Sequence, residues 1–496
     1  MSLVQFLVQG AQPGYANQVE HIARNWETFL GSRALELLDE AEFVDRLVNM
    51  LESGTIAEPV QIQIISDLLS LAWWRGLSIS DLNAGRLFHC ATKFFIALCD
   101  TVKLPERSVA LQDVRRNHAV FVGTLQDPLH SPSSAAIDYV ASLALNPEIN
   151  TIDIYYGGQI SQRMQGYIDS QFSDLNNKNV INFIVNDLSD NLLLKIYSRN
   201  NCTFHFMCES HLSPLISVLA LMGPTVMFIC SDEIPMQYAD VYWFTQKSDY
   251  IESLWQRRGA PTNLISNYDY IPTYPSLVKR PKAPMLKLDL GLNDSNFVIA
   301  TVGNRLGMDL DERFVSGMER ALKRHPNCIW LMVGDLPQNL LSACEQVIGD
   351  QFRYIAFEPE LDRLMPMVDV FANPFRPGGG VSAHIALGAG CVVLSLYTGG
   401  VAALVPAQHC ATDVEDYFDK LDRLIQDKTL LDDWRSVQQT NFRSMTDPAA
   451  FSQSLFEAID TAHARFERRQ GQSLAEMIYG QKSTGKALKS VKKRSR

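Results

Sequence analysis

The sequence lacks any close pairing of cysteines. Its nine cysteines are scattered, with no Cys-x-x-Cys pair and no His-Cys cluster at zinc spacing. This pattern argues against a disulfide framework and against a structural zinc site. It fits a reducing cytosol best, so we predict a cytoplasmic protein. We separately predict that the protein needs neither a metal nor another cofactor.

Long hydrophobic runs are also missing. No apolar stretch reaches the roughly 18 residues that a membrane-spanning helix needs. The N-terminal sequence, MSLVQFLVQGAQPGY, has no basic segment, and glutamine interrupts its short apolar run. We therefore predict neither a signal peptide nor a membrane span.

Positive charge is scarce over most of the chain. The 496 residues carry a net charge of −11, which argues against general nucleic-acid binding because neutralising phosphates needs a basic face. The segment after Gln481 is the exception, with seven cations and no acid. We predict a disordered basic tail over residues 476–496, and weak contact of this tail with acidic lipid or RNA is the alternative.

Residues 1–110 are predicted to form an all-helical domain. Apolar side chains recur at helical spacing at Ile22 and Trp26, and again from Phe43 to Leu51. No clean repeat period indicates a tetratricopeptide array. The polar residues are typical of solvated helix faces, and recognition of an acceptor is the alternative role.

From residue 111 to 278 the pattern changes to strands that alternate with helices. The predicted strands are 118–125, 151–156, 180–185, 202–207 and 226–230. Such alternation predicts a parallel sheet covered by helices on both faces. Ligands bind at the carboxyl ends of the strands in these sheets. The first such end is the loop 123–134, GTLQDPLHSPSS.

A second unit of the same kind is predicted for residues 279–446. Residues 258–275 are expected to form a loop and 278–284 a linker. The predicted strands are 297–303, 328–334, 354–357, 370–372 and 392–396. An amphipathic helix over 447–475 is expected to cross back to the first sheet. The predicted fold class is therefore α/β, with two doubly wound Rossmann-like domains facing a cleft after an all-helical N-terminal domain.

The segment 369–395, DVFANPFRPGGGVSAHIALGAGCVVLS, has the order strand, glycine loop, helix, strand. Three successive glycines let the backbone approach a bulky group closely, and the start of the following helix favours an anion such as a diphosphate. It is not a Walker loop, because no Lys-Ser or Lys-Thr pair follows, and it lacks the spaced glycines of a dinucleotide fingerprint. A glycine turn that merely reverses the chain is the alternative.

Two side chains at strand ends are candidates for chemistry. His130 stands just before a Pro-Ser-Ser helix start, and its ordinary pKa suits proton transfer, although it could simply cap or fill the loop. Arg305 is placed to neutralise a diphosphate, with a surface ion pair as the alternative. Asp309 and Asp311 have the spacing of a metal-binding Asp-x-Asp motif, but we expect them to serve the start of the following helix. The remaining histidines of the first unit are predicted to be packed: His118, His205 and His211.

Three segments together resemble the two-domain glycosyltransferases of the GT-B architecture. They are 369–395, 297–335 (FVIATVGNRLGMDLDERFVSGMERALKRHPNCIWLMVGD) and 127–136 (DPLHSPSSAA). Within that class the chain is similar to the bacterial cytoplasmic protein N-glycosyltransferases that modify large adhesins. It resembles the nucleocytoplasmic O-GlcNAc transferases more distantly. The likeness covers roughly residues 115–460, and it includes 211–224.

The resemblance implies a nucleotide-sugar donor site on the second unit and an acceptor side on the first. The glycine stretch would hold the donor diphosphate, Asn304 or Arg305 would contact a phosphate, and uracil would lie near Ala356 and Phe357. His130 matches the family's acceptor-side histidine. The donor-site candidates are Asn304, Arg305, Phe357, Arg376, Gly378, Gly379, Gly380, Val381, Ser382 and His384. The acceptor-side candidates are His130 as the catalytic residue, Asp127 and Ser131.

One position departs from the family. Where the family has a carboxylate on the donor helix to hold the ribose hydroxyls, this chain has Ile385, which accepts no hydrogen bond. The leading hypothesis is a metal-independent transferase that moves a hexose from UDP-Glc or UDP-GlcNAc to a protein acceptor. A catalytically silent partner or specificity subunit is one alternative, and a transferase acting on a glycan or lipid-linked acceptor is another. A GT-B-like epimerase is disfavoured because we find no convincing pair of carboxylates.

Overall fold

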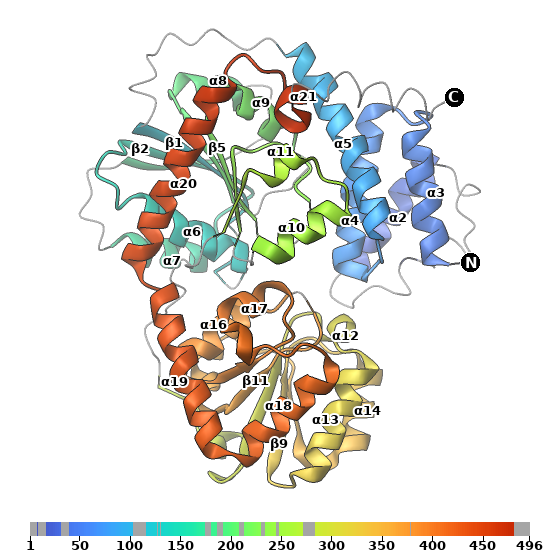
Figure 1. Cartoon of the computed structure of the whole chain (residues 1–496), viewed down its shortest axis with the longest axis vertical. Coiled ribbons are helices and arrows are strands. Elements are labelled where there is room, and N and C mark those ends of the chain that lie inside the picture. The colour runs from blue at the N-terminus through green and yellow to red at the C-terminus, as the bar shows by residue number, and fades with distance from the viewer. Residues whose placement is uncertain are drawn as a thin grey trace. The chain divides into compact units, whose positions relative to one another are not determined.

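The computed structural model describes residues 7, 16–30, 39–102, 116–125, 127–128, 130–173, 180–185, 192–207, 213–229, 234–244, 248–270, 283–376 and 378–480. The chain divides into two units (Figure 1). Unit 1 comprises residues 1–271 and 452–496, and unit 2 comprises residues 272–451. Residues 481–496 of the predicted basic tail and residues 278–282 of the predicted linker lie outside the described residues.

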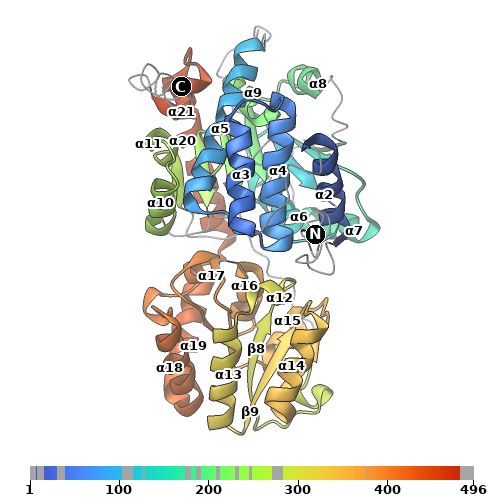
Figure 2. The ribbon, with the colours of Figure 1, turned by 90° about the vertical axis from the view of Figure 1, so that its right-hand side faces the viewer.

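Unit 1 begins with helices. They are α2 (Ala16–Leu30), α3 (Glu40–Glu52), α4 (Glu58–Arg75) and α5 (Asp81–Thr101). Figure 2 shows α3, α4 and α5 side by side. Asp39 caps α3 by accepting a hydrogen bond from the Glu42 amide, and Gly76 ends α4 in the left-handed conformation. The helices share one hydrophobic core with the first sheet, so the described part of residues 1–110 packs as part of unit 1.

The first sheet has seven parallel strands in the order β3-β2-β1-β4-β5-β6-β7. The strands are β1 (Asn117–Thr124), β2 (Thr151–Gly157), β3 (Val180–Val185), β4 (Thr203–Met207), β5 (Thr225–Ile229), β6 (Val241–Phe244) and β7 (Tyr268–Tyr270). The helices between them are α6 (Ser131–Leu143), α7 (Gln162–Phe172), α8 (Leu192–Ser198), α9 (Pro214–Met222), α10 (Ser248–Arg257) and α11 (Thr262–Ile265). The predicted loop over 258–275 is wrong where α11 and β7 lie, because β7 pairs with β6 at the edge of the sheet.

Unit 2 repeats this topology with five parallel strands in the order β10-β9-β8-β11-β12. The strands are β8 (Phe297–Val302), β9 (Cys328–Val333), β10 (Phe352–Ile355), β11 (Val370–Ala372) and β12 (Val392–Leu394). The α-helices are α12 (Leu306–Asp309), α13 (Glu312–Arg324), α14 (Gln338–Ile348), α15 (Leu361–Leu364), α16 (Gly380–Gly388), α17 (Gly399–Leu404), α18 (Val414–Gln426) and α19 (Lys428–Met445). Successive strand residues enter different cores, Val298 on one face and Ile299 on the other. The α/β fold class with two doubly wound units is thereby confirmed.

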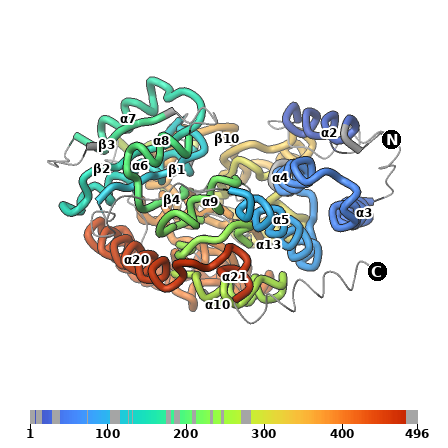
Figure 3. The backbone as a smooth tube through the Cα atoms, turned by 90° about the horizontal axis from the view of Figure 1, so that it is seen from above, coloured from blue at the N-terminus to red at the C-terminus, as the bar shows by residue number. Residues whose placement is uncertain are grey.

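Helix α20 (Pro448–Arg469) starts at the predicted Asp447-Pro448 signal and carries the chain back to unit 1. Its predicted apolar face is buried, and the residues concerned are Phe451, Leu455, Ile459, Ala462 and Phe466. The predicted helix over 447–475 ends at Arg469. The short helix α21 (Leu474–Tyr479) follows α20 (Figure 3) and lies beside α5 and α11 (Figure 1). The predicted disordered tail over 476–496 is therefore wrong for residues 476–479, which are helical. Segments from both ends of the sequence therefore close the core of unit 1.

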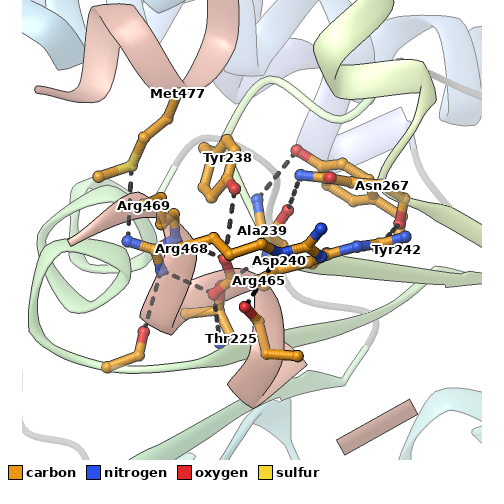
Figure 4. Close-up of polar contacts among 12 residues, drawn as sticks. Thr225, Tyr238, Ala239, Asp240, Tyr242, Asn267, Arg465, Arg468, Arg469 and Met477 are labelled. Atoms are coloured by element: carbon orange, nitrogen blue, oxygen red, sulfur yellow. Dashed lines mark hydrogen bonds and ion pairs between the residues drawn. The ribbon is translucent and has the colours of Figure 1, made fainter. Parts of the chain in front are cut away.

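A buried ion pair fixes the end of α20. Arg469 donates two hydrogen bonds to the carboxylate of Asp240, at 2.5 and 2.6 Å, and this carboxylate also accepts from Thr225 (Figure 4). Arg465 donates to the carbonyl oxygens of Asp240 and Asn267. Thr225 begins β5, and Asp240 and Asn267 come directly before β6 and β7. These bonds therefore join α20 to the amino ends of three strands, so the helix is an integral part of unit 1.

Candidate functional site

Both sheets reverse their strand order beside their first strand, between β1 and β4 in unit 1 and between β8 and β11 in unit 2. In open α/β sheets, ligands bind outside the carboxyl ends of the strands at this point. The loop after β1 holds His130, and the loops after β8 and β11 hold Arg305 and the glycine stretch. The topology therefore places most of the predicted site residues at the two switch points.

The glycine stretch forms the N-terminus of α16. Gly379 is the N-cap residue with a φ of 96°, in the left-handed region that favours glycine, and no side chain caps the helix. A Cβ atom at Gly379 would lie 2.5 Å from Oδ1 of Asn373 and 2.7 Å from Nη2 of Arg376. This close packing requires glycine and sets the direction of the Gly380, Val381 and Ser382 amides. Amides at a helix start favour an anion.

Arg376 connects the chain segments that surround the glycine stretch. Its side chain is 6% exposed. It donates to Oδ1 of Asn373 at 3.1 Å, to Asp309 at 2.5 Å and to the carbonyl of Val302 at 2.6 Å. These contacts tie the end of β8, the loop after β11 and helix α12 into one structure. We interpret Arg376 as a positioning residue beneath the predicted donor site.

Arg305 lies beside the glycine stretch. A Cβ atom at Gly378 would be 3.9 Å from Nη2 of Arg305, and the arginine side chain is only 12% exposed. Its Nη2 atom is 3.7 Å from Oδ1 of Asp309, whose other oxygen accepts the shorter bond from Arg376. Two guanidinium groups thus face one carboxylate beside the α16 N-terminus. This electrostatic environment suits a diphosphate.

The two aspartates of the Asp-x-Asp sequence have different roles. Asp311 caps α13 by accepting a 2.8 Å hydrogen bond from the Phe314 amide, as expected. The same expectation was wrong for Asp309, because Arg376 binds its carboxylate. Across the described ranges, no group of three or more His, Cys, Asp and Glu side chains is arranged to hold a metal ion.

The other predicted donor-site residues differ in exposure. Asn304 is exposed, and Phe357 is 68% exposed just past the end of β10. His384 is 2% exposed and packs edge-on against the ring of Phe442, with ring centroids 4.8 Å apart. Burial lowers the pKa of His384 to about 4. We therefore interpret His384 as a core residue of unit 2, behind the helix start.

The depressed pKa of His384 predicts acid-sensitive stability of unit 2. The unfolded chain takes up a proton near pH 6.5 whereas the folded unit resists it, so stability is complete above about pH 7 and falls as the pH drops from about 6.5 towards about 4. The full difference corresponds to roughly 3 kcal/mol. Hydrogen exchange of α16 and α19 peptides between pH 7 and pH 4.5, corrected for intrinsic rates, measures it. His384→Phe should flatten this dependence, and an unchanged slope would contradict the assignment.

His130 is the N-cap residue of α6 in unit 1. Its Nδ1 atom is 2.7 Å from Oγ of Ser133, and that hydroxyl donates a 2.7 Å hydrogen bond to the carbonyl of Thr124. Partial burial of the ring lowers the pKa of His130, while the nearby Asp127 carboxylate opposes this effect. Asp127 is itself 3.8 Å from Arg163 of α7. The side chain of Ser131 lies outside the described part of the structure.

The predicted packing of two other histidines is confirmed. His118 and His205 are at most 1% exposed, and Nδ1 of His118 lies 2.7 Å from Nε2 of His205. The other ring nitrogen of His205 is 2.7 Å from the hydroxyl of Tyr139. These rings form part of the interior of unit 1, and His211 lies outside the described residues.

Comparison with known proteins rests on structure alone. No protein-family model matches the sequence, and no curated protein does so. The structure of an O-GlcNAc transferase mutant from Thermobaculum terrenum matches with 14% identity, a TM-score of 0.59, and coverage of 94% of this chain and 90% of that one. A glycosyltransferase from Rickettsia africae ESF-5 matches at 10% identity, 70% and 98% coverage and a TM-score of 0.48, which is too low to add weight. The chain thus has a GT-B glycosyltransferase-like fold, as the resemblance in sequence predicted.

The described helices were also compared with the requirements of a membrane-spanning helix. None of the described helices combines sufficient length with sufficient apolar character to cross a bilayer.

Proposed function

We propose that this protein is a metal-independent glycosyltransferase that moves a hexose from a UDP-linked sugar, UDP-Glc or UDP-GlcNAc, to a protein acceptor in the cytoplasm. The observation that carries the proposal is the position of Arg305 against Gly378 at the N-terminus of α16. A cation and a row of backbone amides at a topological switch point suit a diphosphate. The GT-B glycosyltransferase-like fold supports a sugar diphosphate as the donor.

The proposed chemistry uses electrostatic stabilisation. As the bond between the sugar carbon and the diphosphate oxygen breaks, negative charge builds up on the leaving diphosphate. Arg305 and the amides of Gly380, Val381 and Ser382 would stabilise this charge without a metal ion, and preoriented groups of this kind lower the barrier most. Arg376 would contribute indirectly by holding Asn373 and Asp309 in place.

For the uracil base and the ribose of the donor, we assign contacts from the exposure of the candidate side chains. Phe357 presents an exposed ring at the end of β10, against which a uracil base can lie, and Asn304 is exposed beside Arg305. Ile385 offers no hydrogen bond to the ribose, and His384 is buried. We therefore expect the affinity for UDP to depend on the phosphate contacts more than on the ribose.

His130 is proposed to act on the acceptor, with Asp127 and Ser131 on the same loop as further candidates. A histidine can orient an acceptor group or take up its proton. The replacement of the expected ribose-binding carboxylate by Ile385 favours a second candidate function. This is a partner or specificity subunit that keeps the fold without turnover.

Calorimetry with UDP, UDP-Glc, UDP-GlcNAc and a GDP-sugar, in the presence of EDTA, tests the donor site. We expect binding of the UDP compounds and a roughly 10- to 100-fold weaker affinity in Arg305→Ala, since a hydrogen bond to a charged group contributes about 1.5–3 kcal/mol. Arg313→Ala is the matched control, because Arg313 is 68% exposed and pairs with Asp311. Its affinity should equal that of the parent protein.

Release of UDP in the presence of candidate acceptors tests turnover. His130→Ala should lower the rate about 10²-fold or more if it acts as a general base. Binding of UDP without turnover would favour the silent partner. Unchanged turnover in both Arg305→Ala and His130→Ala would rule out the assigned roles.

A further inference from the structure

The first turn of α6 holds a short chain of hydrogen bonds that ends on His130. The backbone carbonyl of Thr124, the hydroxyl of Ser133 and Nδ1 of His130 follow one another, with 2.7 Å between neighbouring atoms. Ser133 is completely buried, and the His130 carbonyl accepts hydrogen bonds from the Ser133 and Ser134 amides. The chain therefore joins the end of β1, the loop and the helix start.

This geometry determines where the protons lie. A carbonyl oxygen only accepts hydrogen bonds, so the single hydroxyl proton of Ser133 must point at Thr124. The lone pairs of the serine oxygen then face Nδ1 of His130, and a contact of 2.7 Å is favourable only if Nδ1 carries a proton. In neutral imidazole the other nitrogen, Nε2, is then left as an acceptor. Within the described part of unit 1, Nε2 has no hydrogen-bond partner.

We propose that Ser133 is a positioning residue that fixes His130 in the Nδ1-protonated form and leaves Nε2 as the atom that accepts a proton from the acceptor. The catalytic part of this inference rests on the proposed function, whereas the tautomer does not. In the reaction, the acceptor heteroatom would bond to the sugar carbon as the bond to the diphosphate breaks. Its proton would pass to Nε2, giving an imidazolium whose Nδ1–H still points at Ser133.

Nuclear magnetic resonance of protein labelled with 15N-histidine tests the tautomer directly. Two-bond proton–nitrogen correlations distinguish a protonated ring nitrogen from an unprotonated one, and His130→Gln identifies the signals of His130. Above the pKa of His130, we expect a protonated Nδ1 and an unprotonated Nε2. Ser133→Ala should shift the population towards a protonated Nε2, and Ser133→Thr should retain the parent pattern. A protonated Nε2 in the parent, or an unchanged pattern in Ser133→Ala, would overturn the proposal.

Ser142→Ala is the matched control for these measurements. Ser142 lies on the same helix, and its hydroxyl donates a 2.9 Å hydrogen bond to the Asp138 carbonyl. Its removal should change neither the His130 signals nor the UDP affinity. A shift of the His130 signals in this variant as large as that in Ser133→Ala would overturn a specific role for Ser133.

Kinetics test the catalytic consequence separately. Ser133→Ala should lower kcat by about 10- to 100-fold at unchanged KM for the donor, because general base catalysis contributes about 10²–10⁴-fold. The acid limb of its pH profile should move to lower pH, because the imidazolium loses a hydrogen-bond acceptor. Ser133→Thr should restore both values. A parent protein with the expected tautomer but no transfer activity would contradict the proposed function and leave the role of Ser133 in setting the tautomer supported.

Discussion

Replacing Arg469 by alanine is expected to lower the free energy of unfolding of unit 1 by about 3–5 kcal/mol, the usual cost of removing one partner of a buried ion pair. The Asp240 side chain is fully buried and that of Arg469 is 6% exposed. Without the arginine, the buried carboxylate is left with neutral donors such as Thr225 and Tyr238. The end of α20 would also lose its hydrogen bond to the Gly223 carbonyl.

Hydrogen exchange followed by peptide mass spectrometry measures this effect in each unit separately. Exchange should accelerate in α20, β5 and β6 of unit 1, and it should stay unchanged in β8 and β9 of unit 2. Arg468→Ala is the matched control, since Arg468 is exposed on the same helix and, among the residues that the structure describes, donates to the Ala464 carbonyl alone. Its effect should stay within about 0.5 kcal/mol. Equal effects of the two substitutions would show that the ion pair does not anchor α20.

Gly379→Ala should have the largest effect on the proposed donor site. Alanine would adopt a φ of 96° only under strain, and its Cβ atom would lie 2.5 Å from Oδ1 of Asn373. Backbone strain of this kind costs about 1–3 kcal/mol. Relief of the clash requires the start of α16 to move, which displaces the amides proposed to bind the diphosphate. Loss of a hydrogen bond to a charged group costs about 1.5–3 kcal/mol, so we expect the UDP affinity to fall by about 10²-fold.

Gly388→Ala provides the matched control at the other end of α16. A Cβ atom there would meet the ring of Phe442 at 3.5 Å, an ordinary contact. Since alanine favours helix more than glycine does, this variant should be as stable as the parent or up to about 1 kcal/mol more stable, with unchanged UDP affinity. Calorimetry and thermal unfolding of the two variants give the comparison. Normal UDP binding by Gly379→Ala would contradict the proposed role of the helix start.

Hydrophobic alternation was sufficient to predict most of the fold. The segments 180–185 and 370–372 have the bounds predicted for them, and the other predicted strands lie within a few residues of theirs. The strands β6 and β7 were missed because each is short, with four and three residues. In β7, which lies at the edge of the sheet, an aspartate between two tyrosines gives no apolar run.

The candidate site was predictable in outline because its loops follow strand ends. His130, Arg305 and the glycine stretch all lie where a parallel sheet binds ligands. The role of Arg376 could not be foreseen, because its contact with Asp309 joins residues 67 positions apart. Ser133 was missed for a different reason. Its spacing of three from His130 at a helix start is a usable signal, but the bond to the Thr124 carbonyl depends on the conformation of the loop.

The return of α20 to unit 1 has a consequence for biosynthesis. Unit 2 is a continuous stretch of chain, whereas unit 1 needs residues 452–480 in addition to the segment that precedes unit 2. Domains fold as units while the ribosome delivers them from the N-terminus. Because unit 2 is translated between them, Asp240 lacks its ion-pair partner Arg469 until unit 2 has been synthesised. Unit 1, whose first segment is translated before unit 2, therefore completes its folding after unit 2 has been synthesised.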